Sequence, residues 1–140
     1  MSLVSVRAHA VTAQVARYAH TSTLLADSSV LVTGGIGAAN IPIDSVTLFR
    51  SIDGLAGPGA DGYVTAAPLT TAGGVARASH TATLLPDGRV LVVGGVSDAI
   101  AAACDSAVGD IVCDTGHIYN PVTNGWTAVA GNMTTPRFNH

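Results

Sequence analysis

A nineteen-residue phrase occurs twice in this chain. Residues 17–35 read RYAHTSTLLADSSVLVTGG and residues 77–95 read RASHTATLLPDGRVLVVGG, with twelve of the nineteen positions identical. The opening of the phrase returns as RFNH at 137–140. Self-similarity at a fixed spacing indicates stacked supersecondary units, each of which buries its apolar face against a neighbour. The sequence therefore predicts a repeat protein, and two units with the start of a third are too few to close a ring.

Each copy of the phrase has the pattern of a β-hairpin. Residues 80–85 and 89–93 are rich in Thr, Val and Leu, and Pro86-Asp87-Gly88 between them predicts a tight turn. The first copy has Ala26-Asp27-Ser28 at this place, which predicts a weaker turn in the same hairpin. The second strand of each hairpin is an uninterrupted apolar run, which is typical of a strand with both faces covered.

Two further strands are expected in each unit. The third covers residues 45–49 in the first unit and 116–119 in the second. The fourth begins at Trp126 in the second unit, and residues 63–67 correspond to it in the first. Each unit is therefore predicted to be a four-stranded antiparallel meander of roughly 60 residues.

The order of these signals resembles the kelch repeat, in which a hairpin ending in Gly-Gly is followed by a Tyr and then a Trp. The phrase R-x-x-H-T-x-T-L-L-x-D-x-x-V-L-V-x-G-G is similar to the bacterial kelch variety of galactose-oxidase-like β-propellers. The resemblance implies an all-β fold with about two four-stranded antiparallel blades, an incomplete ring. In the first unit, Phe49 stands for the Tyr and Tyr63 loosely for the Trp.

The resemblance also implies a domain organisation. Residues 1–16 would be the outer strand of a preceding blade with its linker, 17–76 the first repeat, 77–136 the second, and 137–140 the start of a third. Two blades alone would expose an apolar sheet face at each end, so we expect further blades in cis or identical chains in trans to cover these faces. We expect part of a larger secreted or surface propeller, because the chain stops within a repeat signature. A complete chain of this sequence would be cytoplasmic, since its first residues lack a signal peptide's apolar core.

The residues of the repeat signature have both a structural and a functional interpretation. His20, His80 and His140 are spaced 60 residues apart, and three histidines facing a propeller axis would suggest a metal site. We favour a structural role, in which each Arg and His fix the start of a blade by hydrogen bonding. These positions are Arg17, His20, Gly34, Gly35, Arg77, His80, Gly94, Gly95, Tyr119, Trp126, Arg137 and His140.

The two cysteines, Cys104 and Cys113, lie in one Gly- and Asp-containing segment. A disulfide is the favoured interpretation, with two free thiols or a metal or catalytic role as alternatives. A disulfide would indicate an oxidising compartment. No pattern of further zinc ligands accompanies the pair.

Acidic residues gather in the same long segment, at Asp98, Asp105, Asp110 and Asp114. Oxygen ligands in such a loop suggest calcium, although the spacing matches no known calcium loop, and solvated acidic loops are the common case. We expect the long loops 36–44 and 96–113 to lie at one end of the meander, where protein or carbohydrate ligands would bind.

The composition excludes several classes of protein. A hydrophobic content of 48% with 11% charged residues argues against disorder. The net charge is −3, with no lysine, so we expect no nucleic-acid partner. No apolar run is long enough to span a membrane.

No catalytic motif appears in the sequence. The resemblance to galactose and glyoxal oxidases implies a copper-radical site of two tyrosines, two histidines and a cysteine cross-linked to a tyrosine, but none of these ligands transfers to a position here. We therefore predict a non-catalytic scaffold or interaction module without a cofactor. The alternatives are part of a copper-radical oxidase whose active-site residues lie outside this chain, and a self-assembling ring that binds carbohydrate or protein.

Overall fold

The computed structural model describes residues 15–50, 62–98, 104–105 and 111–140. Within these ranges the chain is built from antiparallel β-strands with two short 3-10 turns, η1 (Ala38–Asn40) and η2 (Leu69–Ala72). The predicted all-β class is confirmed. No helix in the described part approaches the length and apolar character needed to cross a bilayer. Of the predicted outer strand and linker over residues 1–16, residues 1–14 lie outside the described residues.

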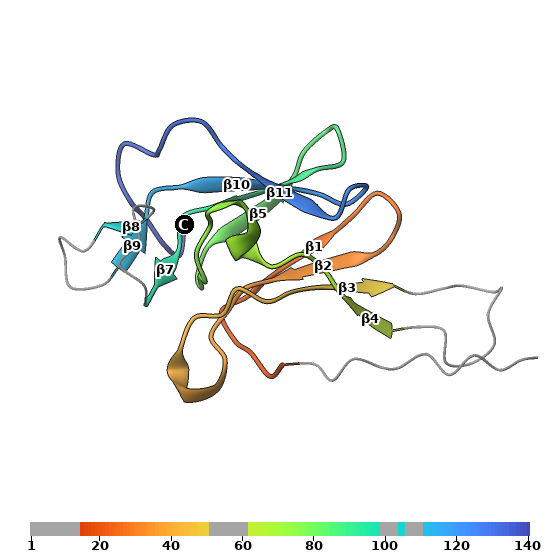
Figure 1. Cartoon of the computed structure of the whole chain (residues 1–140), viewed down its shortest axis with the longest axis horizontal. Coiled ribbons are helices and arrows are strands. Elements are labelled where there is room, and N and C mark those ends of the chain that lie inside the picture. Colours follow the sequence, from red (N-terminus) through yellow and green to blue (C-terminus); the bar gives the residue numbers. More distant parts are fainter. Residues whose placement is uncertain (1–14, 51–61, 99–103, 106–110) are drawn as a thin grey trace, which may run out of the picture.

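The first repeat forms a four-stranded sheet in which chain order equals spatial order (Figure 1). Its strands are β1 (Thr21–Leu24), β2 (Val30–Thr33), β3 (Val46–Arg50) and β4 (Gly62–Thr65). The β1–β2 turn is closed by the Leu25 N–H donating to the Ser29 carbonyl oxygen and the Ser28 N–H donating to that of Leu25, and Ser28 lies at φ 65°. A non-glycine residue in the left-handed region is unfavourable, so we expect this turn to be less stable than that of the second repeat.

The second repeat forms an equivalent sheet, with β5 at one edge and β11 at the other. Its strands are β5 (Thr81–Leu84), β6 (Val90–Val93), β10 (Gly116–Asn120) and β11 (Gly125–Ala128). Here Gly88 occupies the left-handed position of the turn at φ 82°. The registers of the two sheets correspond pair by pair: Phe49 lies opposite Tyr63, as Tyr119 lies opposite Trp126. Both meanders agree with the predicted strand order.

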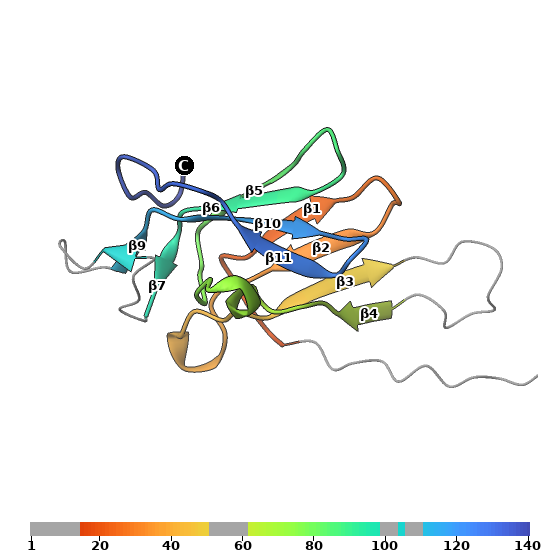
Figure 2. The same ribbon diagram turned by 45° about the horizontal axis from the view of Figure 1, so that its top comes forward.

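A third sheet appears where the sequence analysis expects a loop. Strands β7 (Val96–Ser97), β8 (Cys104–Asp105) and β9 (Ile111–Cys113) pair in the order β7-β9-β8. These strands are only two or three residues long, too short for a periodic pattern to reveal them. In both ribbon views this sheet and η1 lie at one end of the molecule, and the β1–β2 and β5–β6 turns lie at the other (Figures 1 and 2). We call these the loop end and the hairpin end.

The two four-stranded sheets stack on one another and enclose the main core (Figure 2). The first sheet contributes Leu31, Val46, Leu48 and Ala66, and the second contributes Val90, Val92, Tyr119 and Trp126. Directly opposed residues in neighbouring strands share a face, so each sheet uses one face for this contact. The core therefore lies between the repeats and not within either one, as expected for stacked units.

Candidate functional site

Arg77 is a fully buried arginine at the start of the second repeat. Its Nη1 donates hydrogen bonds to the carbonyl oxygens of Gly94 and Thr115, each at 3.1 Å, and its Nη2 donates to Thr115 Oγ1 at 3.2 Å. Burial lowers the pKa of Arg77 to about 10, so the guanidinium stays charged at neutral pH. These bonds join the segment before β5 to the C-terminal end of β6 and the N-terminal end of β10, and so fix where the repeat begins.

Arg17 makes the same set of bonds in the first repeat. Its Nη1 donates to the carbonyl oxygens of Gly34 and Ser45 at 3.0 and 2.8 Å, and its Nη2 donates to Ser45 Oγ at 2.9 Å. The recurrence shows that the arginine of the signature is used within its own repeat. Desolvation lowers the pKa of Arg17 as well, although this side chain is only partly buried.

His80 connects the second repeat to the first. Its Nε2 lies 2.9 Å from Thr21 Oγ1, in β1 of the preceding sheet. The ring is 5% exposed, and its pKa falls to about 3 through burial first, and then through the positive charge of Arg77 and the proximity of His20. His80 is therefore neutral at physiological pH. His140 repeats the contact on the second sheet, 3.0 Å from Thr81 Oγ1.

The paired glycines of the signature give the next repeat room to begin. Gly35 donates its N–H to the carbonyl oxygen of Arg77 at 2.9 Å, and Gly95 donates to Arg137 in the same way at 3.0 Å. A Cβ on Gly34 would lie 2.4 Å from the Arg77 carbonyl oxygen, and one on Gly94 would lie 2.5 Å from that of Arg137. Both glycines also have positive φ, so a side chain is excluded here by conformation and by space.

Tyr119, Asn124 and Trp126 form a second junction near the outer strands. Trp126 Nε1 donates to the carbonyl oxygen of Ala67 at 2.7 Å, and Asn124 Oδ1 accepts from the Ala67 N–H at 2.9 Å. Tyr119 completes the group by donating its hydroxyl to Asn124 Oδ1 at 2.9 Å. The aromatic residues of the second repeat thus hold the connection that leaves the first sheet. Asn124 and Thr21 were not predicted as junction residues; a threonine after the histidine in both copies is the signal for Thr21.

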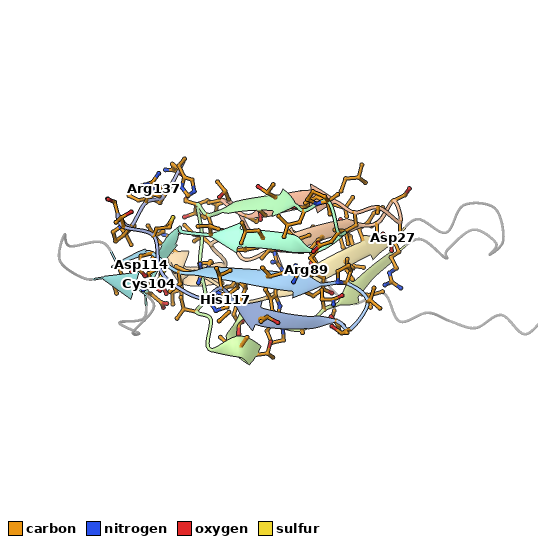
Figure 3. All side chains as sticks on the ribbon, turned by 90° about the horizontal axis from the view of Figure 1, so that it is seen from above. Asp27, Arg89, Cys104, Asp114, His117 and Arg137 are labelled. Atoms are coloured by element: carbon orange, nitrogen blue, oxygen red, sulfur yellow. A yellow bond between two sulfur atoms is a disulfide. The ribbon has the colours of Figure 1, made fainter. Side chains whose placement is uncertain are left out.

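The loop end carries the disulfide and part of the acidic segment (Figure 3). Cys104 and Cys113 form a disulfide between the paired strands β8 and β9, and this group packs on Val75. Asp114 accepts a hydrogen bond from Asn132 Nδ2 at 2.8 Å, which links the segment after β11 to the loop end.

The other acidic residues of this segment contribute little to a described site. Asp98 is exposed, Asp105 lies in β8, and Asp110 lies outside the described residues. Calcium binding at this segment stays a prediction.

A shallow groove lies at the hairpin end, between the turns of the two repeats. It has a volume of about 530 Å³ and is lined by residues 25–27, 87–89 and 120–122. Its charged groups are already engaged: Asp87 pairs with Arg89 at 2.7 Å, and Asp27 accepts from the backbone N–H of Ser29. Asp27 and Arg89 lie at the end of the molecule opposite Cys104 (Figure 3). Nothing in this groove is arranged for chemistry.

Comparisons with known proteins agree with the fold. No protein-family model matches this chain, and no curated protein is similar enough in sequence to match. Among solved structures it is similar to a fungal alcohol oxidase of the AA5 family, determined in complex with copper, with a TM-score of 0.63 and 21% sequence identity. The similarity covers 86% of this chain and 23% of that one. The chain therefore shares its fold with about a quarter of the oxidase's length.

The described residues do not fit a copper ion. In the ranges that the structure describes, no three His, Cys, Asp or Glu side chains come together as a metal-binding group. His80 is committed to Thr21, and both cysteines are joined in the disulfide. His80 Nε2 and both cysteines are thus used in structural contacts.

Proposed function

We propose that the two four-stranded sheets are adjacent blades of a kelch-type propeller and that this chain is a non-catalytic scaffold and interaction module. The observation that carries the proposal is the junction at His80. His80 is a buried, neutral imidazole whose Nε2 bonds to Thr21 of the preceding sheet and whose Nδ1 is buried away from solvent, which supports a structural role. Arg77 is likewise consumed by backbone carbonyls, and Trp126 by Ala67. The side chains best suited to catalysis or metal binding are therefore the ones that hold the blades together.

The loop end is the ligand-binding face in this proposal. The β7-β9-β8 sheet and η1 project there, away from the core between the blades (Figure 1). Loops on a rigid scaffold are where binding residues are commonly recruited. The disulfide between β8 and β9 supports a secreted or surface location, because such bonds persist in oxidising compartments. A protein or a carbohydrate is the class of ligand that we propose.

Copper binding tests the scaffold proposal directly. We expect the purified 140-residue chain to bind Cu(II) only weakly and without saturation at one ion, as followed by electron paramagnetic resonance. We also expect no hydrogen peroxide from primary alcohols in the presence of copper. The variant H80N serves as the matched control, because it removes an imidazole from the junction. A saturable single-copper spectrum that H80N abolishes, or peroxide production by the wild type, would contradict the proposal.

The similarity to the AA5 alcohol oxidase favours a second candidate function. In this alternative the blades belong to a copper-radical oxidase whose active-site residues lie outside this chain. The reading frame around this segment would then encode a Tyr-His pair and a cysteine next to an inner strand. The longer protein, expressed and loaded with copper, would oxidise alcohols. A longer reading frame without those residues, joined to adhesion-type domains, would instead favour the interaction module.

A further inference from the structure

The second sheet has one apolar face that no other sheet covers in the described structure. Leu91, Val93 and Ile118 on this face are half-buried, and Val129 is 37% exposed. The same positions of the first sheet are occupied by residues that the second sheet covers. Their exposures are between 0% and 4%, and the residues are Leu31, Thr33, Leu48 and Ala66. The face of the second sheet therefore has the composition of an interface but lacks its partner.

Among the described residues, no sheet covers the opposite face of the first sheet. Val30, Val32, Phe49 and Tyr63 line an open groove of about 360 Å³, together with Arg17 and His20. The equivalent residues of the second sheet pack on the first sheet with exposures of 8% or less, and they are Val90, Val92, Tyr119 and Trp126. The molecule thus carries both halves of its own internal interface, one on each outer face. None of the strand residues of these two faces is charged, so no like-charge repulsion opposes their contact.

Residues 137–140 occupy the place where a following sheet would attach. His140 lies against Thr81 Oγ1, and the Arg137 carbonyl oxygen accepts from the Gly95 N–H. In the internal interface these two positions are filled by His80 and Arg77 acting on Thr21 and Gly35. All four residues of this short segment are exposed, so another segment of the same sequence type can replace it.

We propose that a second copy of this chain packs head to tail on the first. The uncovered face of its first sheet covers the second sheet of its neighbour, and its residues 17–20 displace the neighbour's residues 137–140 from Thr81 and Gly95. This proposal rests on the proposed function, because it treats the contact between the two sheets as the template. The contact is heterologous, so it closes into a ring where the rotation per copy allows and otherwise extends.

Complementary face variants test the head-to-tail arrangement by sedimentation velocity. We expect the wild type to associate with rising concentration. V32E blocks the uncovered face of the first sheet, and I118E blocks that of the second, so each variant alone should be monomeric. Mixed in equal amounts they should form a 1:1 heterodimer, since each keeps the face that the other lacks. V122E, in a turn where Val122 is 92% exposed, is the matched control and should associate as the wild type does.

Other outcomes overturn the proposal. If V32E alone forms a dimer, the second sheets pair with each other and the arrangement is not head to tail. Circular dichroism checks that the variants fold. If either does not, V32T and I118T replace the pair, and each should weaken association at least tenfold.

Shortening the chain tests the displacement of residues 137–140. A chain ending at residue 136 frees Thr81 and Gly95, so it should associate several-fold more tightly than the wild type. Weaker association would show that residues 137–140 belong to the interface and are not displaced. A wild type that stays monomeric at all concentrations would overturn the self-association. It would leave the scaffold proposal intact, because further blades in cis would then cover the two faces and the copper test is independent.

Discussion

The first and second repeats contain the same arginine in different surroundings. Arg17 and Arg77 both bond two carbonyl oxygens and one hydroxyl at distances between 2.8 and 3.2 Å. Arg77 is nevertheless fully buried, whereas Arg17 is only partly buried, because a sheet precedes the second repeat and none precedes the first in the described structure. The hydrogen bonds of a repeat are thus set by its own sequence, and the burial of those bonds is set by its neighbour.

The aromatic residues of the outer strands show the same contrast. Tyr119 and Trp126 lie with ring centroids 5.1 Å apart, and Phe49 and Tyr63 lie 5.2 Å apart. The first pair is buried between the sheets, and the second lines an open groove. Truncating an aromatic side chain should therefore lower the free energy of unfolding by different amounts in the two repeats, even where the geometry is shared.

The largest expected difference concerns Trp126. W126A should destabilise the fold by about 4 kcal/mol, because it leaves a cavity between the sheets and removes the donor to Ala67. The equivalent Y63A should cost no more than about 1.5 kcal/mol, since its side chain is already half in contact with water. Urea denaturation of both variants at low protein concentration, where the chain is monomeric, measures the two losses. Equal losses would show that the two repeats are energetically equivalent.

The second comparison uses the two arginines. R77A should destabilise the protein by about 3 kcal/mol, because the carbonyls of Gly94 and Thr115 lose a charged donor at a site that water does not reach. R17A should cost about 1 kcal/mol, since water can replace part of what is lost. Thermal unfolding followed by circular dichroism checks the order. A larger loss of stability for R17A than for R77A would contradict the view that the neighbouring sheet determines how much these hydrogen bonds stabilise the fold.

The third comparison concerns the loop end, where only the second repeat has cysteines. The double variant C104S/C113S should lower stability by about 2 to 3 kcal/mol, because the unfolded chain regains the freedom of the closed loop. Hydrogen exchange should rise in β8 and β9 before it rises in β1–β4. Reduction of the wild type with dithiothreitol is the matching treatment and should give the same shift. Loss of protection spread evenly over both repeats would contradict a local role.

The smallest expected effect, over the measured range from pH 7.0 to 5.5, is the pH dependence from His80. Its folded pKa of about 3 lies below the ordinary value of 6.5, so the unfolded state binds the proton more readily. Stability is therefore complete above about pH 6.5 and falls as the pH is lowered towards 3, by about 1.4 kcal/mol for each pH unit. Denaturant unfolding at pH 7.0, 6.0 and 5.5 measures the slope. His117, whose pKa burial also lowers, adds in the same direction. H80N should reduce the slope of stability against pH by the amount that corresponds to one proton taken up on unfolding. An unchanged slope would assign the effect to other groups.

The repeat pattern predicted the hairpins and the meanders well. The turn residues Asp87 and Gly88 and the apolar runs 30–32 and 90–93 gave the strands because their signals are local. Strands β7, β8 and β9 were missed, because two- and three-residue strands are stabilised by pairing and by the disulfide and not by their own pattern. The part of the junction that Asn124 forms with Ala67 was also missed, since those residues are 57 positions apart.

The sequence by itself determined that this protein is made of two equivalent units, because the period, the glycine pairs and the turn residues all act over short distances. Only the tertiary structure decided which copy of each residue is buried. That choice follows from stacking: one face of each sheet meets the other, and the same side chain becomes core or surface according to the side on which its neighbour lies. His20 and His80, alike in sequence and different in exposure, show that distinction most directly.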